Sequence, residues 1–367
     1  ALRALSWNCL HLSEKTGAAK KAVSALQRVI READFIALQE IDDLRVVESL
    51  VKGLSKSSGE WDFLQERISK GGGTGSQECY AFIWRTSTVE LVSPGFIVTG
   101  EGGGTGAEHY FHRPPLVATF RARPSGFVFT ATTIHITYSG RKKTWAPAEE
   151  AARILELKNM AALAARLEAA YDGVVDRVML LGDFNLPARE KYFGDLLGPA
   201  LGYRPSLDPD VWVSMSSNIG LLPGVVTGVG QQSKKKRRTK ATDKLYDNVY
   251  LSPALRGASA GGDVIGGGVI NLMDMLQGAM PAGWDLGVSD PTALEFKMKR
   301  VVVEQTISDH LPVWCDLSVV KGVPHRAPRG KLSKVKVGVT NWARHAGDAR
   351  VRLGEKYRKK TSVGTFR

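Results

Sequence analysis

Six short segments of this sequence end in side chains of the types that can bind metal ions or transfer protons. Each segment follows an apolar stretch with the length and composition of a β-strand. Carboxylate and amide oxygens are preferred ligands of hard divalent cations, and imidazole is the usual acid or base near neutral pH. The segments end in Asn8, Gln39-Glu40, His135, Asp183-Phe184-Asn185, Asp247 and Ser308-Asp309-His310.

Taken singly, each of these endings has an ordinary structural explanation. Asp and Asn after a strand are common turn formers and helix caps, and a lone His beside an apolar run is usually structural. Six endings in one domain are harder to explain in this way, because neighbouring strands bring their ends to a common rim. Such a rim suits phosphodiester hydrolysis, which needs a cation of the Mg²⁺ or Mn²⁺ class beside an acid/base group. The sequence lacks a Cys or His cluster of the kind that binds zinc.

The elements that must position these side chains are strand-like runs separated by helical stretches. The runs are rich in Val, Ile, Phe, Tyr, Trp and Thr, and apolar residues recur at i, i+3 and i+4 over Ala18–Arg31 and Pro147–Tyr171. This mixture predicts an α/β layered domain built on mostly antiparallel sheets. The predicted strands include Leu2–Leu10, Phe35–Leu38, Cys79–Trp84, Leu116–Phe120, Phe127–Ile136, Arg177–Leu181, Asn248–Leu251 and Pro312–Leu317.

Length and charge divide the chain into two parts. Its 367 residues, 43% of them hydrophobic, are enough for one large domain, which we place at residues 1–320. The net charge is +13, but residues 321–367 contain fourteen Lys and Arg against two acids, so the first 320 residues carry only +1. A surplus of this kind favours a nucleic-acid partner over a merely solvated tail. The residues of this basic extension that we expect to bind nucleic acid include Lys331, Lys334, Lys336, Arg358, Lys359 and Lys360.

Three further features lie between the strand-like runs. The glycine clusters Gly71–Gly75 and Gly102–Gly106 lack the frame of a phosphate-binding loop and are expected to be surface loops. A basic run before Asp247 is predicted to lie at the rim of the site and to bind nucleic acid. It also resembles a nuclear-import signal, but matches to that pattern often arise by chance. This run is Lys234, Lys235, Lys236, Arg237 and Arg238.

The compartment is indicated only indirectly. The widely spaced Cys9, Cys79 and Cys315 are read as buried free thiols in a reducing compartment. No apolar run reaches 18 residues, so we expect no membrane partner. A signal peptide is not recognisable at the start, and a sequence beginning without Met fits a removed organelle-targeting segment. We therefore expect an intracellular protein, in the mitochondrion first and the nucleus second.

The ordered series of site residues resembles the endonuclease/exonuclease/phosphatase family over residues 2–318, and within it the deoxyribonuclease I branch. Two further segments strengthen the resemblance to that branch: His112-Arg113-Pro114-Pro115 before a strand, and Ser76-Gln77-Glu78-Cys79-Tyr80. The resemblance implies a four-layered α/β sandwich, with two sheets face to face and helices outside.

The resemblance also implies how metal and phosphate are bound. Glu40 would be the principal ligand of Mg²⁺ or Mn²⁺, with Asn8 and Asp309 near the same ion. Asp183 and Asn185 would position the attacking water or a second metal ion and contact the scissile phosphate. Whether one or two ions act is left open.

An acid/base pair and a phosphate-binding arginine complete the implied site. His310, oriented by Asp247, and His135, oriented by Glu78, would exchange protons with water and the leaving group. Arg113 would bind the phosphate. Which histidine is the base stays open.

The chain departs from the deoxyribonuclease I branch in ways that concern substrate and compartment. That branch is typically secreted and disulfide-bonded and lacks a basic tail. The same signature occurs in abasic-site endonucleases, RNA deadenylases, tyrosyl-DNA phosphodiesterases, sphingomyelinases and inositol-phosphate phosphatases, and the basic charge disfavours the lipid and small-molecule members. We therefore predict a metal-dependent nuclease acting on DNA or RNA.

The alternative is a subunit of a large ribonucleoprotein, such as an organellar ribosome, that retains the nuclease fold. Its basis is Lys331–Arg367, where Lys and Arg alternate with Val, Gly, Thr and the aromatic Trp342, Tyr357 and Phe366. Segments of this composition resemble extensions that thread into ribosomal RNA. The two hypotheses are compatible if the tail docks an active enzyme onto an RNA-rich particle.

Overall fold

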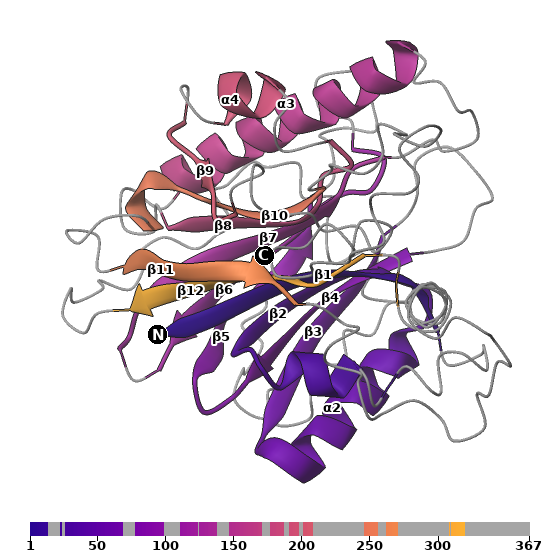
Figure 1. Cartoon of the computed structure of the whole chain (residues 1–367), viewed down its shortest axis with the longest axis vertical. Coiled ribbons are helices and arrows are strands. Elements are labelled where there is room, and N and C mark those ends of the chain that lie inside the picture. The colour runs from indigo at the N-terminus through magenta and orange to yellow at the C-terminus, as the bar shows by residue number, and fades with distance from the viewer. Residues whose placement is uncertain are drawn as a thin grey trace, which may run out of the picture.

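In the computed structural model of the protein, the described residues form two six-stranded sheets and three α-helices with described bounds (Figure 1). All the strand pairs are antiparallel except one central pair in each sheet, β1 with β2 and β7 with β8. The described residues are 1–13, 23, 26–68, 78–98, 111–123, 125–137, 147–170, 177–186, 191–197, 201–207, 246–255, 262–270, 308 and 310–319.

The strands of each sheet lie in a spatial order that differs from their order along the chain. The first sheet runs from β11 (Gly262–Val269) through β12 (Val313–Val319), β1 (Leu2–Leu12), β2 (Phe35–Ile41) and β4 (Glu78–Arg85) to β3 (Trp61–Ile68). The second runs from β5 (Val89–Ile97) through β6 (Leu116–Ala122), β7 (Val128–His135), β8 (Val178–Asp183) and β10 (Asp247–Leu251) to β9 (Arg204–Pro205). The helices are α2 (Leu44–Ser58), α3 (Pro147–Ala170) and α4 (Lys191–Leu196), with a 3₁₀ turn, η5, at Pro253–Leu255.

The elements stack in four layers, with α2 outside the first sheet and α3 and α4 outside the second (Figure 1). Separate hydrophobic clusters fill the α2 side and the α3/α4 side, and a third lies between the sheets. This arrangement confirms the predicted sandwich of two mostly antiparallel sheets flanked by helices.

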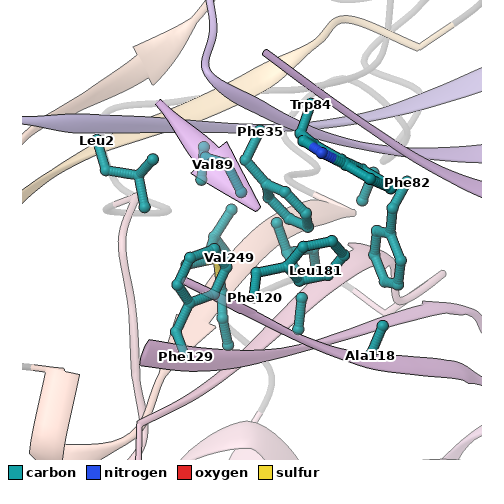
Figure 2. Close-up of a cluster of buried hydrophobic side chains, with 14 of the residues drawn as sticks. Leu2, Phe35, Phe82, Trp84, Val89, Ala118, Phe120, Phe129, Leu181 and Val249 are labelled. Carbon is teal, nitrogen blue, oxygen red and sulfur yellow. The ribbon is translucent and has the colours of Figure 1, made fainter. Parts of the chain in front are cut away.

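Aromatic side chains hold the two sheets together. Phe35, Phe82 and Trp84 of the first sheet meet Phe120 and Phe129 of the second, and all five side chains are buried (Figure 2). The ring centroids of Phe35 and Phe120 lie 4.7 Å apart with an edge-on geometry. Burying a side chain of this size contributes roughly 1.5–3 kcal/mol. The packing fixes the spacing between the sheets, on which the site depends.

Local sequence determines where helix α2 begins and ends and which of its faces packs on the first sheet. It begins after Asp43, whose carboxylate accepts a hydrogen bond from the backbone N–H of Arg45, and it ends at Gly59, whose φ is 93°. Its buried residues recur with helical spacing and pack on the first sheet. They are Val46, Val47, Leu50, Val51 and Leu54.

The eight runs predicted as strands all form strands, with ends shifted by up to three residues. The prediction of a helix over Pro147–Tyr171 is confirmed by α3, and residues 26–30 are helical within the predicted Ala18–Arg31. The three cysteines are buried and free, as expected. Both glycine clusters and residues 321–367 lie outside the described residues. No helix in the described part of the chain has the length and apolarity needed to cross a membrane.

Candidate active site

The central parallel strand pairs bring the chemical side chains to one end of the sandwich. In β1 and β2, Asn8 lies in register with Gln39, and in β7 and β8, His135 lies in register with Asp183. His135 and Asp183 end their strands, and Asn8 and Gln39 lie in the carboxyl-terminal halves of theirs. Antiparallel β10 starts at Asp247, which pairs with Asp183, so its first residue reaches the same end.

Buried amides link the two sheets at this end. The Asn8 Nδ2 group donates to Glu40 Oε1 at 3.0 Å and to Asp183 Oδ2 at 3.1 Å, which joins a carboxylate of each sheet. Below it, Gln39 Nε2 donates to Thr133 Oγ1 of β7 at 2.9 Å and to Ser6 Oγ at 3.2 Å. Both amide side chains are fully buried, so these bonds set how the sheets face each other.

Asp183 occupies the centre of the site. Its Oδ1 accepts a hydrogen bond of 2.8 Å from the backbone N–H of Asn185. Its Oδ2 lies 3.6 Å from His135 Nε2 and 3.7 Å from His310 Nε2. The Asn185 side chain is held by a 2.8 Å hydrogen bond from Nδ2 to the carbonyl of Ile136. One carboxylate oxygen therefore faces both histidines.

His310 is held at three points. Its Nδ1 lies 2.7 Å from Asp247 Oδ2, its backbone N–H donates to Ser308 Oγ, and its carbonyl accepts from the Trp7 indole. Ser308 in turn donates to the backbone carbonyl of Asn8 at 2.6 Å. A fully buried Asp247 that accepts the Nδ1 proton leaves Nε2 facing Asp183 and stabilises the imidazolium form.

His135 belongs to a second chain of buried polar groups. Its Nδ1 lies 3.6 Å from Glu78 Oε2, and its backbone N–H donates to the Tyr80 hydroxyl at 2.8 Å. Arg113 binds Glu78 through both carboxylate oxygens, with Nε to Oε2 at 2.5 Å and Nη2 to Oε1 at 3.2 Å. Burial opposes the ionisation of Glu78, but the nearby His135 ring and the hydrogen bonds from Arg113 outweigh it and hold the pKa of Glu78 well below its usual value.

The remaining Arg113 donor suits an anion. Its Nη1 is buried and makes no hydrogen bond with any residue that the structure describes. Two of its three nitrogens are already fixed by Glu78, so the third is held rigidly. A buried, preorganised guanidinium donor is the kind of group that binds a phosphate oxygen. The observed geometry is compatible with the phosphate-binding role expected for Arg113.

Left-handed backbone conformations gather around the site. Leu10, His11, Glu40 and Asn185 have φ between 47° and 55°, a region that costs a non-glycine residue about 1–3 kcal/mol. Conformations of this kind persist where the surrounding structure fixes them, commonly at functional sites. Gly182, before Asp183, has φ of 149°, and a Cβ there would lie 1.9 Å from the Ile134 carbonyl oxygen. Only glycine allows β8 to approach β7 this closely.

The donor set fits a divalent cation. Four carboxylates, of Glu40, Glu78, Asp183 and Asp247, are gathered with the guanidinium of Arg113, so negative charge is in excess among these groups. The Oε2 atom of Glu40 is buried and has no hydrogen-bond partner among the described residues. A buried carboxylate oxygen in this situation requires a positive partner.

A second group of possible ligand atoms combines Asp183 with Asp247 and His310. One ligand atom each from Asp183, Asp247 and His310 lies within 4.8 Å of the others. The structure thus offers cation ligands on both the Glu40 and the His310 sides of the site.

Most of the residues predicted for the site are brought together at this end. These are Asn8, Glu40, Glu78, Arg113, His135, Asp183, Asn185, Asp247 and His310. The predicted metal ligand Asp309 lies outside the described residues, and so do the basic residues Lys234, Lys235, Lys236, Arg237, Arg238, Lys331, Lys334, Lys336, Arg358, Lys359 and Lys360.

Three residues near the site have roles that the sequence does not predict. Gln39 belongs to one of the motifs, but its bond between the sheets is visible only in the structure. Tyr80 is two residues after Glu78 on β4. Because residues two apart on a strand lie on the same face, the sequence could have placed Tyr80 beside Glu78. His11 follows Asn8 by three residues, and its Nε2 lies 3.7 Å from Glu40 Oε2. The hydrogen bond that the His11 ring donates to Asp42 raises the pKa of His11, with burial opposing it.

Known proteins resemble this chain in sequence and in fold. A deoxyribonuclease of Thioalkalivibrio sp. (strain K90mix) is 30% identical over 251 residues, which cover 68% of this chain and 58% of that protein. The chain thus spans less than two thirds of that relative.

Two solved structures share the fold at a TM-score of 0.50 and 15% identity. They are an endonuclease/exonuclease/phosphatase from Bacteroides vulgatus, with 87% of this chain and 98% of that chain covered, and a family protein from Leptotrichia buccalis, with 86% and 99% covered. The family model "Endonuclease/Exonuclease/phosphatase family" matches residues 5–310, which hold all the site residues described above and every strand except β12 and the first three residues of β1. The chain therefore belongs to the endonuclease/exonuclease/phosphatase family.

Proposed function

We propose that the chain is a divalent-metal-dependent nuclease that hydrolyses phosphodiester bonds of nucleic acids. The observation that carries the proposal is that His310 Nε2 and His135 Nε2 both lie near one Asp183 oxygen, at 3.7 and 3.6 Å. His310 is also held by Asp247 at 2.7 Å. Two positioned imidazoles can take a proton from water and give one to the leaving oxygen.

Different side chains of the site are placed to bind the attacking water and the phosphate. His310 Nε2 and Asp183 Oδ2 are placed to hold the attacking water and accept its proton, since Asp247 keeps the opposite ring nitrogen protonated. Arg113 Nη1 is placed to bind a non-bridging oxygen, and Asn185 holds the Asp183 carboxylate through its backbone N–H and its side-chain amide.

The donor set of the site supports Mg²⁺ or Mn²⁺ as the cofactor. Glu40, through its buried Oε2, and Asp183 would hold the cation, together with Asp309 as the sequence predicts. When bound, the cation neutralises phosphate charge and polarises the phosphoryl oxygens.

The charge of residues 321–367 supports a nucleic acid over a small phosphate ester as substrate. The name of the 30%-identical relative, deoxyribonuclease, makes DNA the first substrate to test. The ribonucleoprotein alternative and the mitochondrial or nuclear location stay predictions. We propose that the basic extension, residues 321–367, brings the enzyme to polyanionic partners.

Nuclease turnover tests the proposal directly. Supercoiled plasmid DNA and a structured RNA are incubated with the protein in Mg²⁺, in Mn²⁺ and in EDTA. We expect cleavage of at least one polymer with metal and none in EDTA. Absence of cleavage of both polymers with both metals would refute the proposal.

A matched pair of variants shows whether the metal acts through this site. Glu40→Gln is expected to raise the metal concentration needed for half-maximal cleavage by at least ~10-fold. Glu60→Gln is the control, because Glu60 is exposed and precedes Trp61 at the opposite end of the first sheet from Glu78. Equal metal dependence of the two variants would remove Glu40 from the proposed metal site.

A further inference from the structure

A bulge in β1 directs His11 toward the site. The register between β1 and β2 shifts between Asn8 and Leu12, and Leu10 and His11 within this interval both have left-handed backbones, with φ of 48° and 54°. Asn8 Oδ1 accepts the Leu10 backbone N–H at 3.1 Å, and the Leu12 carbonyl accepts that of Asp42 at 2.9 Å. The bulge is therefore anchored at both ends. Bulges of this kind change the direction of a side chain next to functional sites.

The His11 imidazole lies between two carboxylates of the neighbouring strand end. Its Nε2 is 3.7 Å from Glu40 Oε2, and its Nδ1 is 3.4 Å from Asp42 Oδ1. The side chain is 54% exposed, whereas that of Glu40 is 13% exposed. His11 thus stands at the solvent side of the buried Glu40 carboxylate.

The two ring nitrogens face different environments. With the Nδ1 proton directed at Asp42, the lone pair is left on Nε2, on the side of Glu40 Oε2. That oxygen is buried and makes no hydrogen bond within the described part of the chain. Histidines that bind metal ions commonly have this arrangement, in which a carboxylate holds the nitrogen that does not bind the ion.

We propose that His11 is a ligand, through Nε2, of the divalent cation held by Glu40, and that Asp42 positions the imidazole. The inference rests on the metal site of the proposed function. Metal–ligand bonds of about 2.0–2.2 Å place two ligand atoms of one ion roughly 3–4 Å apart, which matches the observed 3.7 Å. A nitrogen ligand favours Mn²⁺ and later transition metals over Mg²⁺. The bulge, by positioning His11, would then determine which divalent metal ion the site prefers.

Binding of Mn²⁺ measured by electron paramagnetic resonance tests the proposal without recourse to activity. The amplitude of the free Mn²⁺ signal gives the dissociation constant. Pulsed measurements on the bound ion detect a directly coordinated nitrogen. His11→Asn is the informative variant, because Asn adopts a left-handed backbone readily and is too short to replace the imidazole nitrogen. Melting temperatures of all the variants establish that they are folded.

We expect His11→Asn to weaken Mn²⁺ binding at least ~10-fold and to lose nitrogen coupling that the wild type shows. Asp42→Asn should keep the coupling with weaker binding. Lys52→Gln, at an exposed position on α2, should match the wild type in both respects.

The outcomes separate this inference from the proposed function. If His11→Asn binds Mn²⁺ with wild-type affinity and an unchanged nitrogen signal, His11 is not a ligand, and the Glu40 site and the nuclease proposal still stand. If the wild type binds no Mn²⁺ at all, the proposed metal site and the role of His11 are both overturned.

Discussion

The imidazole ring of His310 is oriented by a short contact with a buried acid. Asp247 Oδ2 lies 2.7 Å from His310 Nδ1, and no part of the Asp247 residue is exposed. A negative acceptor at this point fixes which ring nitrogen carries the proton. It also stabilises the charge that the ring acquires when it accepts a proton from water.

Asp247→Asn separates these electrostatic effects from packing, because the side chains are nearly the same shape. The amide can present its N–H groups to Nδ1, which would place the ring proton on Nε2. We expect kcat to fall by about 10²–10⁴-fold with little change in melting temperature. The control is Asp195→Asn on α4, where the side chain is exposed. Near-wild-type turnover by Asp247→Asn would show that Asp247 does not govern His310.

At the scale of single residues, the sequence is most informative where side chains carry the chemistry. The carboxylates, histidines and Arg113 can be located because their types and order are unusual. Their connections are harder to foresee. Asn8 joins Glu40 to Asp183 across the two sheets, and such a bond depends on sheet packing that no local pattern encodes.

Some strands can be predicted from the sequence more easily than others. The eight predicted runs are the eight inner strands, whereas β11, β3, β5 and β9 form the four edges of the two sheets. Edge strands expose one side and tolerate charge, Gly and Pro. Accordingly, β11 contains three consecutive glycines, β5 contains Pro94-Gly95, and β9 has two residues. Helix α2 is also not predicted, since its Val pair and Gly53 have low helix propensity and packing decides its conformation.

Helix α3 carries a buried acid whose ionisation opposes folding. Glu156 is fully buried, and burial raises its pKa to about 7, although the Thr137 and His112 backbone amides and Arg113 act in the opposite direction. Neither carboxylate oxygen makes a hydrogen bond of standard geometry with the described residues, so these amides compensate only in part. The folded state therefore holds this proton at pH values where the unfolded chain has released it.

Glu156→Gln is expected to stabilise the protein at alkaline pH. With a pKa of 4.5 in the unfolded chain and about 7 in the folded protein, stability declines as pH rises between these values and the penalty is complete above them. The variant should gain up to about 3 kcal/mol at about pH 8 and nearly nothing below pH ~4.5. Urea unfolding of both proteins at the two pH values measures this. A gain that does not depend on pH would rule out ionisation as its cause.

In the whole molecule, charge and chemistry lie in different parts of the sequence. The first 320 residues carry a net charge of +1 and contain every site residue, whereas residues 321–367 carry +12. The family and the sandwich could be predicted because the site motifs recur in order along most of the chain. The polymer that is cleaved could not, since phosphodiester chemistry is the same for DNA and RNA.

Removing residues 321–367 should weaken binding without changing the chemical step. We expect affinity for long nucleic acid to fall at least ~10-fold at low salt, and the dependence of affinity on salt to become shallower, because fewer counterions are released. Turnover of a short, saturating substrate should remain close to wild type. Fluorescence anisotropy at several salt concentrations measures the first effect. An unchanged salt dependence would mean that the tail contacts no phosphates.

The most direct test of the whole site is the rate of cleavage by His310→Ala. His310 comes from the approach to β12, and its partners Asp247 and Asp183 lie on the opposite sheet, so its function requires the two sheets to face each other. With Mg²⁺ or Mn²⁺ present, the wild type should cleave nucleic acid and the variant should be at least ~10³-fold slower at an unchanged melting temperature. Cleavage by His310→Ala at the wild-type rate would contradict a phosphodiesterase site built around Asp183 and the two histidines.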